Sequence, residues 1–225
     1  MIKLSNRLRT IANLTDDNSK IVDIGCDHGM LDIYLVQTKK NIKIIASDIN
    51  KNALNNAIDN INKYQLQNKI KTILSDGLNN IDTTNLNTVI ISGMGAHTIV
   101  GILRMNKDKL NTIDTLIIQS NNDHDFLRKK VVELGYYIID EELVKEKKHI
   151  YTIIKFKKGK KHYNKKQLYF GPILLENNSK LFVEKNDLEL QKLKLLLKLI
   201  PRSHVELRIK TRIKINMYKK LKNKV

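Results

Sequence analysis

The chain of 225 residues contains no tryptophan, two prolines and one cysteine, Cys26. A single cysteine cannot form an internal disulfide, and no cysteine or histidine cluster surrounds it, which excludes a cysteine-based zinc site. No apolar run approaches the roughly 18 residues that a membrane-spanning helix needs. Residues 1–17 mix charged and apolar side chains, unlike a secretory signal peptide. These absences predict a soluble, cytoplasmic protein with no bound metal and no membrane partner.

Acidic residues are scarce in the last third of the chain. Residues 1–156 hold 21 Lys and Arg against 18 Asp and Glu, a net charge of +3, whereas residues 157–225 hold 20 against 5, a net charge of +15. A bias toward lysine, asparagine and isoleucine along the whole chain does not explain why acidic residues nearly vanish there. Such a basic region is typical of proteins that bind a polyanion, with nucleic acid favoured over an anionic membrane surface.

The segment 20–29, KIVDIGCDHG, joins a short apolar run to a glycine turn, and a helical pattern follows at 30–38. This strand, turn and helix order is that of a nucleotide-binding β-α unit. Glycine lets the backbone approach a ligand closely, and the free amides at the start of the helix offer hydrogen-bond donors. The alternative is that Asp23, Gly25 and Gly29 shape a tight turn and bind nothing.

Apolar runs and helical patterns alternate along the first half of the chain, which predicts a mainly parallel sheet. Two later runs, 136–144 and 150–156, are separated by only five residues and must therefore pair antiparallel. This order resembles the seven-stranded, Rossmann-like α/β sheet of class I methyltransferases. The other expected strands lie near 20–24, 43–47, 70–74, 88–92 and 115–119, and the expected helices near 5–14, 30–39, 51–64, 96–105 and 123–134.

The basic run KKGKKHYNKK, residues 157–166, has no apolar period and predicts a linker between two domains. We expect residues 1–157 to form the α/β domain that resembles the class I methyltransferases. Residues 158–225 are expected to form a basic helical domain that binds nucleic acid.

Leucine-rich helical patterns at 181–200 and 205–221, broken by Pro201, predict a helical hairpin with coiled-coil character. We expect its two apolar stripes to pack against each other, and a helix lying on a membrane surface is the alternative. The stripe residues are Leu193, Leu196, Leu197 and Ile200 in the first helix and Val205, Ile209, Ile213, Met217 and Leu221 in the second.

Four strand ends of the expected sheet carry polar or glycine residues, which would converge in the crevice where open α/β sheets bind ligands. For a ligand with an amino-acid end, a ribose and an adenine, Asp27 could take the ammonium, Asp48 the ribose hydroxyls and Asp76 the adenine amino group. Turn formation alone is the alternative for Asp76 and for the segment Gly93–Gly95. The expected cofactor-binding residues are Asp23, Gly25, Asp27, His28, Asp48, Asp76, Gly77, Gly93, Met94 and Gly95.

The segments IVDIGCDHGML, IIASDIN, ILSDGL, VIISGMGAHTI, LIIQSNN and YFGPILL resemble the TrmK family, the bacterial tRNA (adenine-22) N1-methyltransferases. The resemblance covers nearly the full length and implies S-adenosylmethionine as cofactor, N1 of an adenine in the tRNA D-region as acceptor, and a C-terminal coiled-coil domain. Cys26 and Asp32 stand where a serine and a proline are expected, and Ser120 replaces the proline of a Gln-Pro-Asn motif. We expect a monomer whose partner is tRNA.

Methylation of a ring nitrogen uses a lone pair that already exists, so it needs alignment more than a general base. The enzyme must extrude the base, because its Watson–Crick edge is hidden in a stack or pair. Amide, imidazole and aromatic groups suit that task, although a structural role is the alternative for His28 and Tyr151. The expected catalytic residues are His28, Asn121 and Tyr151, with Gln119 and Asn122 as further amides, and the expected RNA-binding residues are Arg7, Arg202, Arg208, Arg212 and Lys214.

Two other functions compete with this interpretation. An NAD(P)-dependent oxidoreductase would carry G-x-G-x-x-G rather than the G-x-x-x-G found here, and its second half would repeat the β-α pattern. A non-catalytic RNA-binding protein on the same fold is the second alternative. The chain also lacks the Asn/Asp-Pro-Pro-Tyr/Phe motif of enzymes that methylate exocyclic amines.

Overall fold

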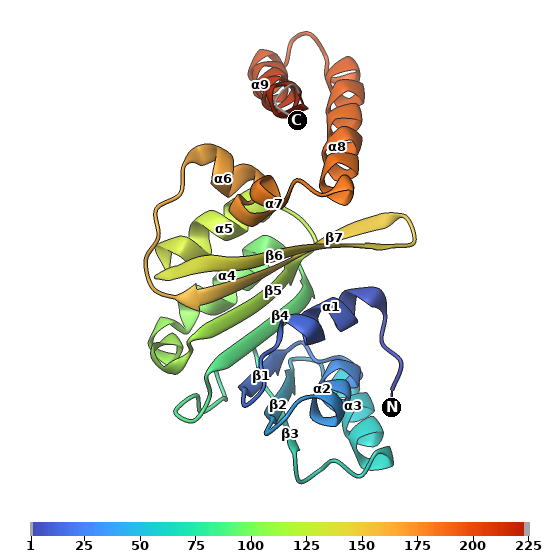
Figure 1. Ribbon diagram of the computed structural model, residues 1–225, viewed down its shortest axis with the longest axis vertical. Helices are drawn as coiled ribbons and strands as arrows, with labels where there is room; N and C mark the ends of the chain where they lie inside the picture. Colours follow the sequence, from blue (N-terminus) through green and yellow to red (C-terminus); the bar gives the residue numbers. More distant parts are fainter. Residues whose placement is uncertain (1, 223–225) are drawn as a thin grey trace. The chain divides into compact units, whose positions relative to one another are not determined.

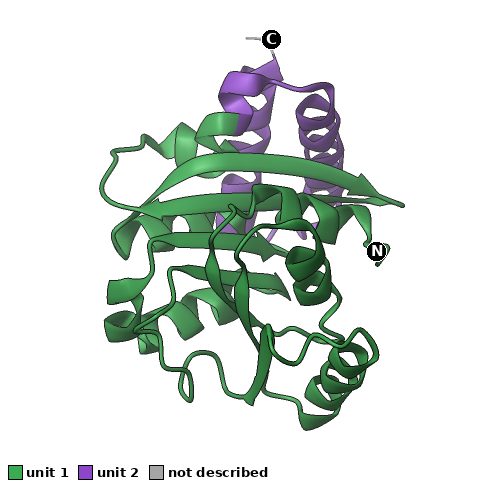
Figure 2. Ribbon diagram, turned by 60° about the horizontal axis from the view of Figure 1, so that its bottom comes forward, with its two compact units in different colours: residues 1–173 green, residues 174–225 purple. Residues whose placement is uncertain are grey.

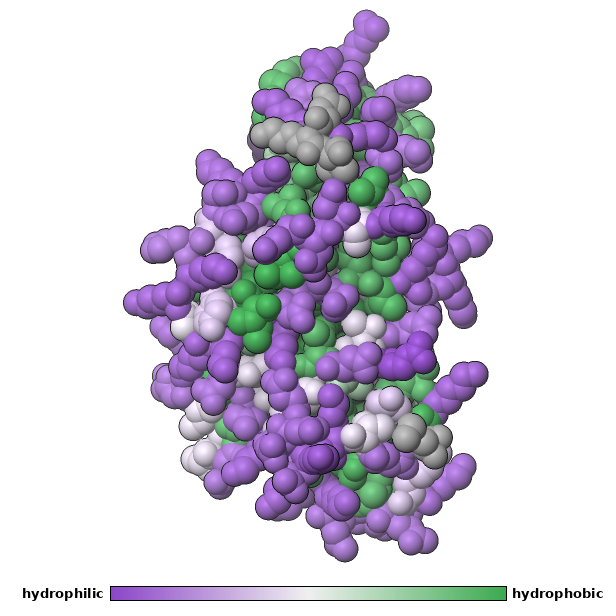
Figure 3. Space-filling model, in the orientation of Figure 1, coloured by the Kyte–Doolittle hydropathy of each residue, from purple (hydrophilic) through white to green (hydrophobic). Residues whose placement is uncertain are grey.

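The computed structural model describes residues 2–222. The chain divides into two compact units, Met1–Ile173 and Leu174–Val225, shown in green and purple in Figure 2. The units therefore divide after Ile173, whereas the sequence predicted a boundary after residue 157. On the face seen in Figure 3, hydrophilic side chains cover most of the surface, with apolar side chains between them.

The first unit is built on a seven-stranded sheet with the order β3-β2-β1-β4-β5-β7-β6 (Figure 1). Strands β1 to β5 pair parallel to their neighbours, whereas β7 runs antiparallel to both β5 and β6. The predicted Rossmann-like sheet with its terminal antiparallel pair is confirmed. The strands are β1 Lys20–Ile24, β2 Lys43–Asp48, β3 Ile70–Leu74, β4 Thr88–Met94, β5 Thr115–Ser120, β6 Tyr136–Glu146 and β7 His149–Lys158.

Helices pack on both faces of this sheet because its central strands are apolar on both sides. In β1, Ile21 joins the cluster with α1, α2 and α3, while Val22 joins the cluster with α4 and α5 on the opposite face. The helices of this unit are α1 Asn6–Leu14, α2 Met30–Thr38, α3 Lys51–Lys63, α4 Ala96–Met105, α5 His124–Glu133 and α6 Lys165–Phe170, with a 3-10 helix η1 at Lys107–Thr112 and α7, Pro172–Asn177, crossing the boundary between the units.

A buried ion pair ties the segment after β7 to the first unit. Arg128 and Glu141 are 1% and 0% exposed, and the Arg128 Nε donates to Glu141 Oε1 at 2.6 Å. Arg128 Nη1 also donates to the carbonyls of Leu168 and Tyr169, and Glu141 Oε2 accepts from the amide of Ile173. Since a buried charge needs such partners, residues up to Ile173 belong with the sheet despite the basic run before them.

We expect Gly171→Ala to destabilise the first unit by about 3 kcal/mol or more. Gly171 has φ +97°, and an added Cβ would lie 2.5 Å from Glu141 Oε2 and 2.9 Å from Arg128 Nη2, so the substitution strains the backbone and disrupts the buried pair. The control is Gly101→Ala within α4, where nothing lies within 4 Å of an added Cβ; it should be neutral or slightly stabilising. Urea unfolding that shows equal stability for the two variants would contradict this prediction.

The second unit is a helical hairpin of α8, Lys180–Leu199, and α9, Val205–Lys222. The predicted hairpin is confirmed, but its predicted packing faces are only partly correct. In α9, Ile209 and Ile213 are 50% and 55% exposed, whereas the predicted Leu221 is buried together with Thr211 and Ile215, which lie outside the predicted stripe. In the first predicted stripe, Ile200 is buried but Leu196 is exposed. The buried face of α9 differs from the predicted one because Arg208 must point toward α8. Its Nη1 donates to the carbonyls of Leu197 and Ile200 and so caps the C-terminal end of α8.

Candidate functional site

A cavity of about 510 Å³ lies at the carboxyl ends of β1, β2 and β4, against α1. This is the edge of the sheet at which α/β folds bind ligands. Most of the predicted cofactor-binding residues line it, namely Asp23, Gly25, Asp27, His28, Asp48, Gly93 and Met94.

The glycine turn after β1 forms the floor of this cavity. The amides of Gly25 and Cys26 donate to the Ser47 carbonyl at 2.8 and 3.0 Å, which fixes the turn against β2. Gly25 has φ +79°, and a Cβ on it would lie 2.5 Å from the Met94 methyl carbon. Glycine at this position therefore keeps the backbone accessible to a ligand.

Three polar side chains stand on the rim of the turn. Asp48 Oδ2 accepts from the Asp27 amide at 3.2 Å, and its Oδ1 accepts from the Asn50 amide at 2.8 Å. The side chains of Asp27 and His28 are 70% and 54% exposed, with His28 Nε2 at 3.6 Å from Asp27 Oδ1. Both side chains are open to a ligand, while Asp48 is already held in place by the backbone.

Asp76, Gly77 and Gly95 lie outside the lining of this cavity. The Ser75 amide donates to the Asp48 carbonyl, so Asp76 lies at the same edge of the sheet, where it is exposed and its carbonyl closes a turn with Asn79. A Cβ on Gly77 would lie 2.8 Å from Ile102, so this glycine also serves packing. Gly95 is the N-cap residue of α4.

Next to the cavity, a buried glutamine organises the ends of β4 and β5. Gln119 is fully buried, and its Oε1 accepts from Arg7 Nη1 at 2.8 Å and from the Gly93 amide at 3.0 Å. Its Nε2 donates to Asn121 Oδ1 at 3.1 Å, and Asn121 Nδ2 donates to the Gly93 carbonyl at 2.7 Å. Gln119 is therefore a positioning residue, and Asn121, which is exposed, is the amide that can meet a substrate.

Tyr151 joins this group through the strand register. Antiparallel pairing of β5 and β7 sets Ser120 opposite Thr152, so Tyr151 follows at the same edge. Arg7 lies with its guanidinium carbon 5.6 Å from the Tyr151 ring centroid. The structure thus brings Asn121 and Tyr151 to one edge of the sheet, next to the cavity that His28 lines.

The predicted RNA-binding residues fall into different settings. Arg7 lines the cavity and donates to Gln119, and Arg208 caps α8, so both guanidinium groups are engaged within the protein. Sequence periodicity could not place Arg7 there, because the position depends on how α1 packs on the sheet. Arg202, Arg212 and Lys214 are exposed on the hairpin.

Two buried carboxyl groups lie behind the glycine turn. Burial, and then the charge of Asp48, raises the pKa of Asp23 to about 7, with Arg7 opposing the shift. Asp32 is fully buried, and neither of its carboxyl oxygens has a hydrogen-bond partner in the described part of the chain. Burial, and then the charge of Asp23, raises the pKa of Asp32 well above its usual value. Burial, and then the charges of Asp32 and Asp23, raise the pKa of the Cys26 thiol. Cys26 therefore stays a protonated thiol.

These shifts predict how the stability of the protein changes with pH. Asp23 keeps its proton up to about pH 7 in the folded state but only to about pH 4 when unfolded. The folded state then binds more protons between these values, so its stability falls as pH rises through that window. Asp32→Asn removes one of the two ionising groups and should raise stability at about pH 8 by roughly 1–3 kcal/mol, with a smaller gain at about pH 5. Thermal unfolding at the two pH values measures this.

The control for this prediction is Asp59→Asn, which changes an exposed carboxylate on α3. It should leave the pH dependence unchanged. If Asp32→Asn loses stability equally at both pH values, the buried carboxyl pair does not control the pH response.

Comparison with known proteins shows to which family this chain belongs. The family model described as tRNA (adenine(22)-N(1))-methyltransferase, TrmK, matches residues 21–223. The chain belongs to this family. The tRNA (adenine(22)-N(1))-methyltransferase of Bacillus subtilis is 31% identical to it over 196 residues, which cover 84% of this chain and 82% of that protein.

Two solved structures of this family type carry the cofactor or its product. TrmK of M. capricolum, in complex with S-adenosylhomocysteine, is 33% identical, with 96% of each chain covered and a TM-score of 0.85. A Streptococcus pneumoniae homologue, described as a tRNA (m1A22) methyltransferase and in complex with S-adenosylmethionine, is 30% identical. The alignment covers 98% of this chain and 99% of that chain, with a TM-score of 0.89. The predicted family, enzyme class and cofactor are thereby confirmed, and the oxidoreductase alternative is not supported.

The residues of this TrmK chain fit S-adenosylmethionine. Asp48 offers a carboxylate to hydroxyl groups, the turn at Gly25 is open to close approach, and the exposed acidic side chain of Asp27 suits a cofactor that carries cationic groups. Within residues 2–222, no helix is long and apolar enough to cross a membrane, and no three His, Cys, Asp or Glu side chains are grouped to hold a metal ion.

Proposed function

We propose that this chain methylates N1 of adenine 22 in the D-region of tRNA, with S-adenosylmethionine bound in the cavity at the ends of β1, β2 and β4. Family membership supports the reaction. The observation that carries the site is that the cavity adjoins the group formed by Gln119, Asn121 and Tyr151. A substrate base placed against these side chains would lie next to the cofactor.

The cofactor supplies a methyl group on a cationic sulfur. The N1 lone pair accepts the methyl without prior loss of a proton, so no side chain has to act as a base, and the protein contributes mainly alignment. In this proposal Asn121 holds the Watson–Crick edge of the extruded adenine and Tyr151 stacks on the ring. Gln119 and Arg7 hold these two residues in position through the contacts described above. His28 lies at the rim, where it can contact either ligand.

Asn121→Ala should lower turnover by roughly tenfold to hundredfold while leaving the affinity for S-adenosylmethionine within about twofold, because the side chain faces the acceptor rather than the cofactor cavity. Single-turnover methylation kinetics and calorimetric cofactor titration measure the two effects separately. Asn56→Ala, an exposed position on α3, is the control and should change neither quantity. A variant that loses cofactor affinity and keeps its turnover would move Asn121 out of the acceptor site.

The acceptor position is tested with two tRNA transcripts that differ only at position 22. Labelled methyl should pass from S-adenosylmethionine to the transcript with adenine at this position and not to the one with guanine. Equal labelling of both transcripts would place the acceptor elsewhere.

We further propose that the protein acts as a monomer in the cytoplasm. Sedimentation tests the oligomeric state, and cell fractionation tests the location.

A further inference from the structure

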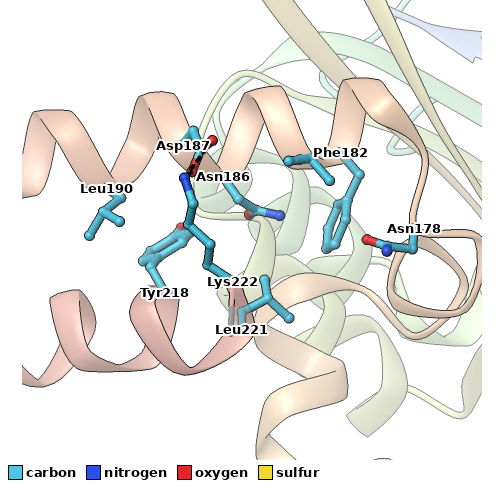
Figure 4. A pocket seen from close by; sticks show the side chains of 9 residues that line it. Asn178, Phe182, Asn186, Asp187, Leu190, Tyr218, Leu221 and Lys222 are labelled. Carbon is cyan, nitrogen blue, oxygen red and sulfur yellow. Dashed lines mark hydrogen bonds and ion pairs between the residues drawn. The ribbon is translucent and has the colours of Figure 1, made fainter. Parts of the chain in front are cut away.

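The helical hairpin contains a second cavity, of about 190 Å³, between α8 and α9 (Figure 4). Its walls are mainly apolar, since Phe182, Leu190 and Leu221 are 2%, 7% and 6% exposed. Phe182 comes from α8 and Tyr218 from α9, so aromatic rings from both helices border the same space. This cavity is small compared with the roughly 300–1,000 Å³ of pockets for drug-sized ligands, and it suits a single ring system.

One polar group in this cavity lacks a partner. The amide nitrogen of Asn186 is buried and has no hydrogen-bond partner in the described part of the chain. Figure 4 shows the Asn186 side chain extending from α8 into the space between the helices, with its nitrogen toward Phe182. Because a buried donor without an acceptor is costly, the cavity is suited to a ligand that is flat, largely apolar and able to accept a hydrogen bond.

The charge of the hairpin identifies the class of ligand. Residues 174–222 hold 13 Lys and Arg against 5 Asp and Glu, a net charge of +8. At the cavity itself, Lys222 pairs with Asp187 at 2.9 Å. A polyanion that carries flat heterocycles meets all of these conditions, whereas an alkyl chain offers no acceptor to Asn186.

We propose that this cavity binds one unstacked nucleobase of the tRNA substrate, at a site separate from the target adenine. This inference rests on the proposed function, because it takes tRNA as the substrate. The base would pack against Phe182 and Tyr218 and accept a hydrogen bond from Asn186, while its phosphates meet the exposed cations of the hairpin. The hairpin thus contributes a specific base-binding site as well as positive charge.

The test compares tRNA binding by full-length variants over a range of salt concentrations. Val183→Phe fills the cavity, and Asn186→Leu removes the donor at similar volume. Each should weaken binding of an unmodified tRNA transcript by roughly fivefold to hundredfold while keeping the log–log salt slope, because phosphate contacts remain. The matched control Arg212→Ala should instead make the slope shallower by about 0.7–0.9. Cofactor affinity and helical circular dichroism should match those of the wild type.

A direct measurement on the wild type does not depend on the variants folding. With methyl-labelled protein, intermolecular NOEs should link tRNA base protons to the methyl groups of Val183 and Leu190. Their absence in the saturated complex, wild-type affinity in both cavity variants, or a loss of affinity explained by a changed salt slope would each overturn the proposal. Wild-type protein that places no methyl on adenine 22 would instead overturn the proposed function, so the two failures are distinguishable.

Discussion

Removal of residues 174–225 is expected to weaken tRNA binding by about a hundredfold or more at moderate salt, while S-adenosylmethionine still binds. The removed part holds 14 Lys and Arg against 5 Asp and Glu, a net charge of +9 that is half of the chain's +18, and each lost phosphate contact lowers affinity through counterion release. All residues that line the cofactor cavity lie in the first unit. Filter binding of tRNA at several salt concentrations, with calorimetry for the cofactor, measures the two activities, and the salt slope should become shallower.

The position of the cut matters for this experiment. A chain that ends at Ile173 keeps the carbonyls of Leu168 and Tyr169 that accept from Arg128. A chain that ends at Lys157 loses them and leaves the ion pair of Arg128 with Glu141 partly unsatisfied, so we expect it to be less stable. If the chain that ends at Ile173 methylates tRNA as well as the full chain does, the hairpin is not the tRNA-binding element.

Asp48→Ala is expected to weaken S-adenosylmethionine binding by roughly fivefold to hundredfold, which corresponds to about 1–3 kcal/mol. The substitution removes the acceptor proposed for the ribose hydroxyls. It also frees the amides of Asp27 and Asn50, which Asp48 now holds, so the glycine turn loses part of its order. Calorimetric titration of the folded variant measures the effect.

Two further variants separate the causes of that loss. Asp48→Asn keeps one acceptor oxygen and should recover part of the affinity, and the exposed-site control Asp59→Ala should bind as the wild type does. If Asp48→Ala binds the cofactor with unchanged affinity, Asp48 lies outside the cofactor site and the ribose assignment is wrong.

The sequence predicted the sheet well, because apolar runs that end in glycine or acidic residues mark buried strands and their carboxyl ends. The predicted strand 20–24 agrees with β1, and the predicted terminal pair agrees with β6 and β7. The helices α6 and α7 were missed, since the basic run before them suggested a linker. A local signal was present in Asn164 and Gln167, which form a capping box at the start of α6.

Features set by tertiary packing could not be predicted from periodicity. Val205, Ile209 and Ile213 follow a four-residue spacing, yet they are exposed because α9 turns Arg208 toward the end of α8. In the same way, a helical pattern alone could not place Arg7 against Gln119. The strand-end residues of the candidate site were within reach of sequence reasoning, whereas the side chains that hold them in position were not.

The position of the methyl group is determined by mass spectrometry of nucleosides and mapped fragments from unmodified tRNA, incubated with this protein and S-adenosylmethionine. If the chain methylates N1 of adenine 22, each tRNA gains one methyl, recovered as 1-methyladenosine and located at position 22. Recovery of the methyl on N6 of adenine or on a guanine would contradict this proposal.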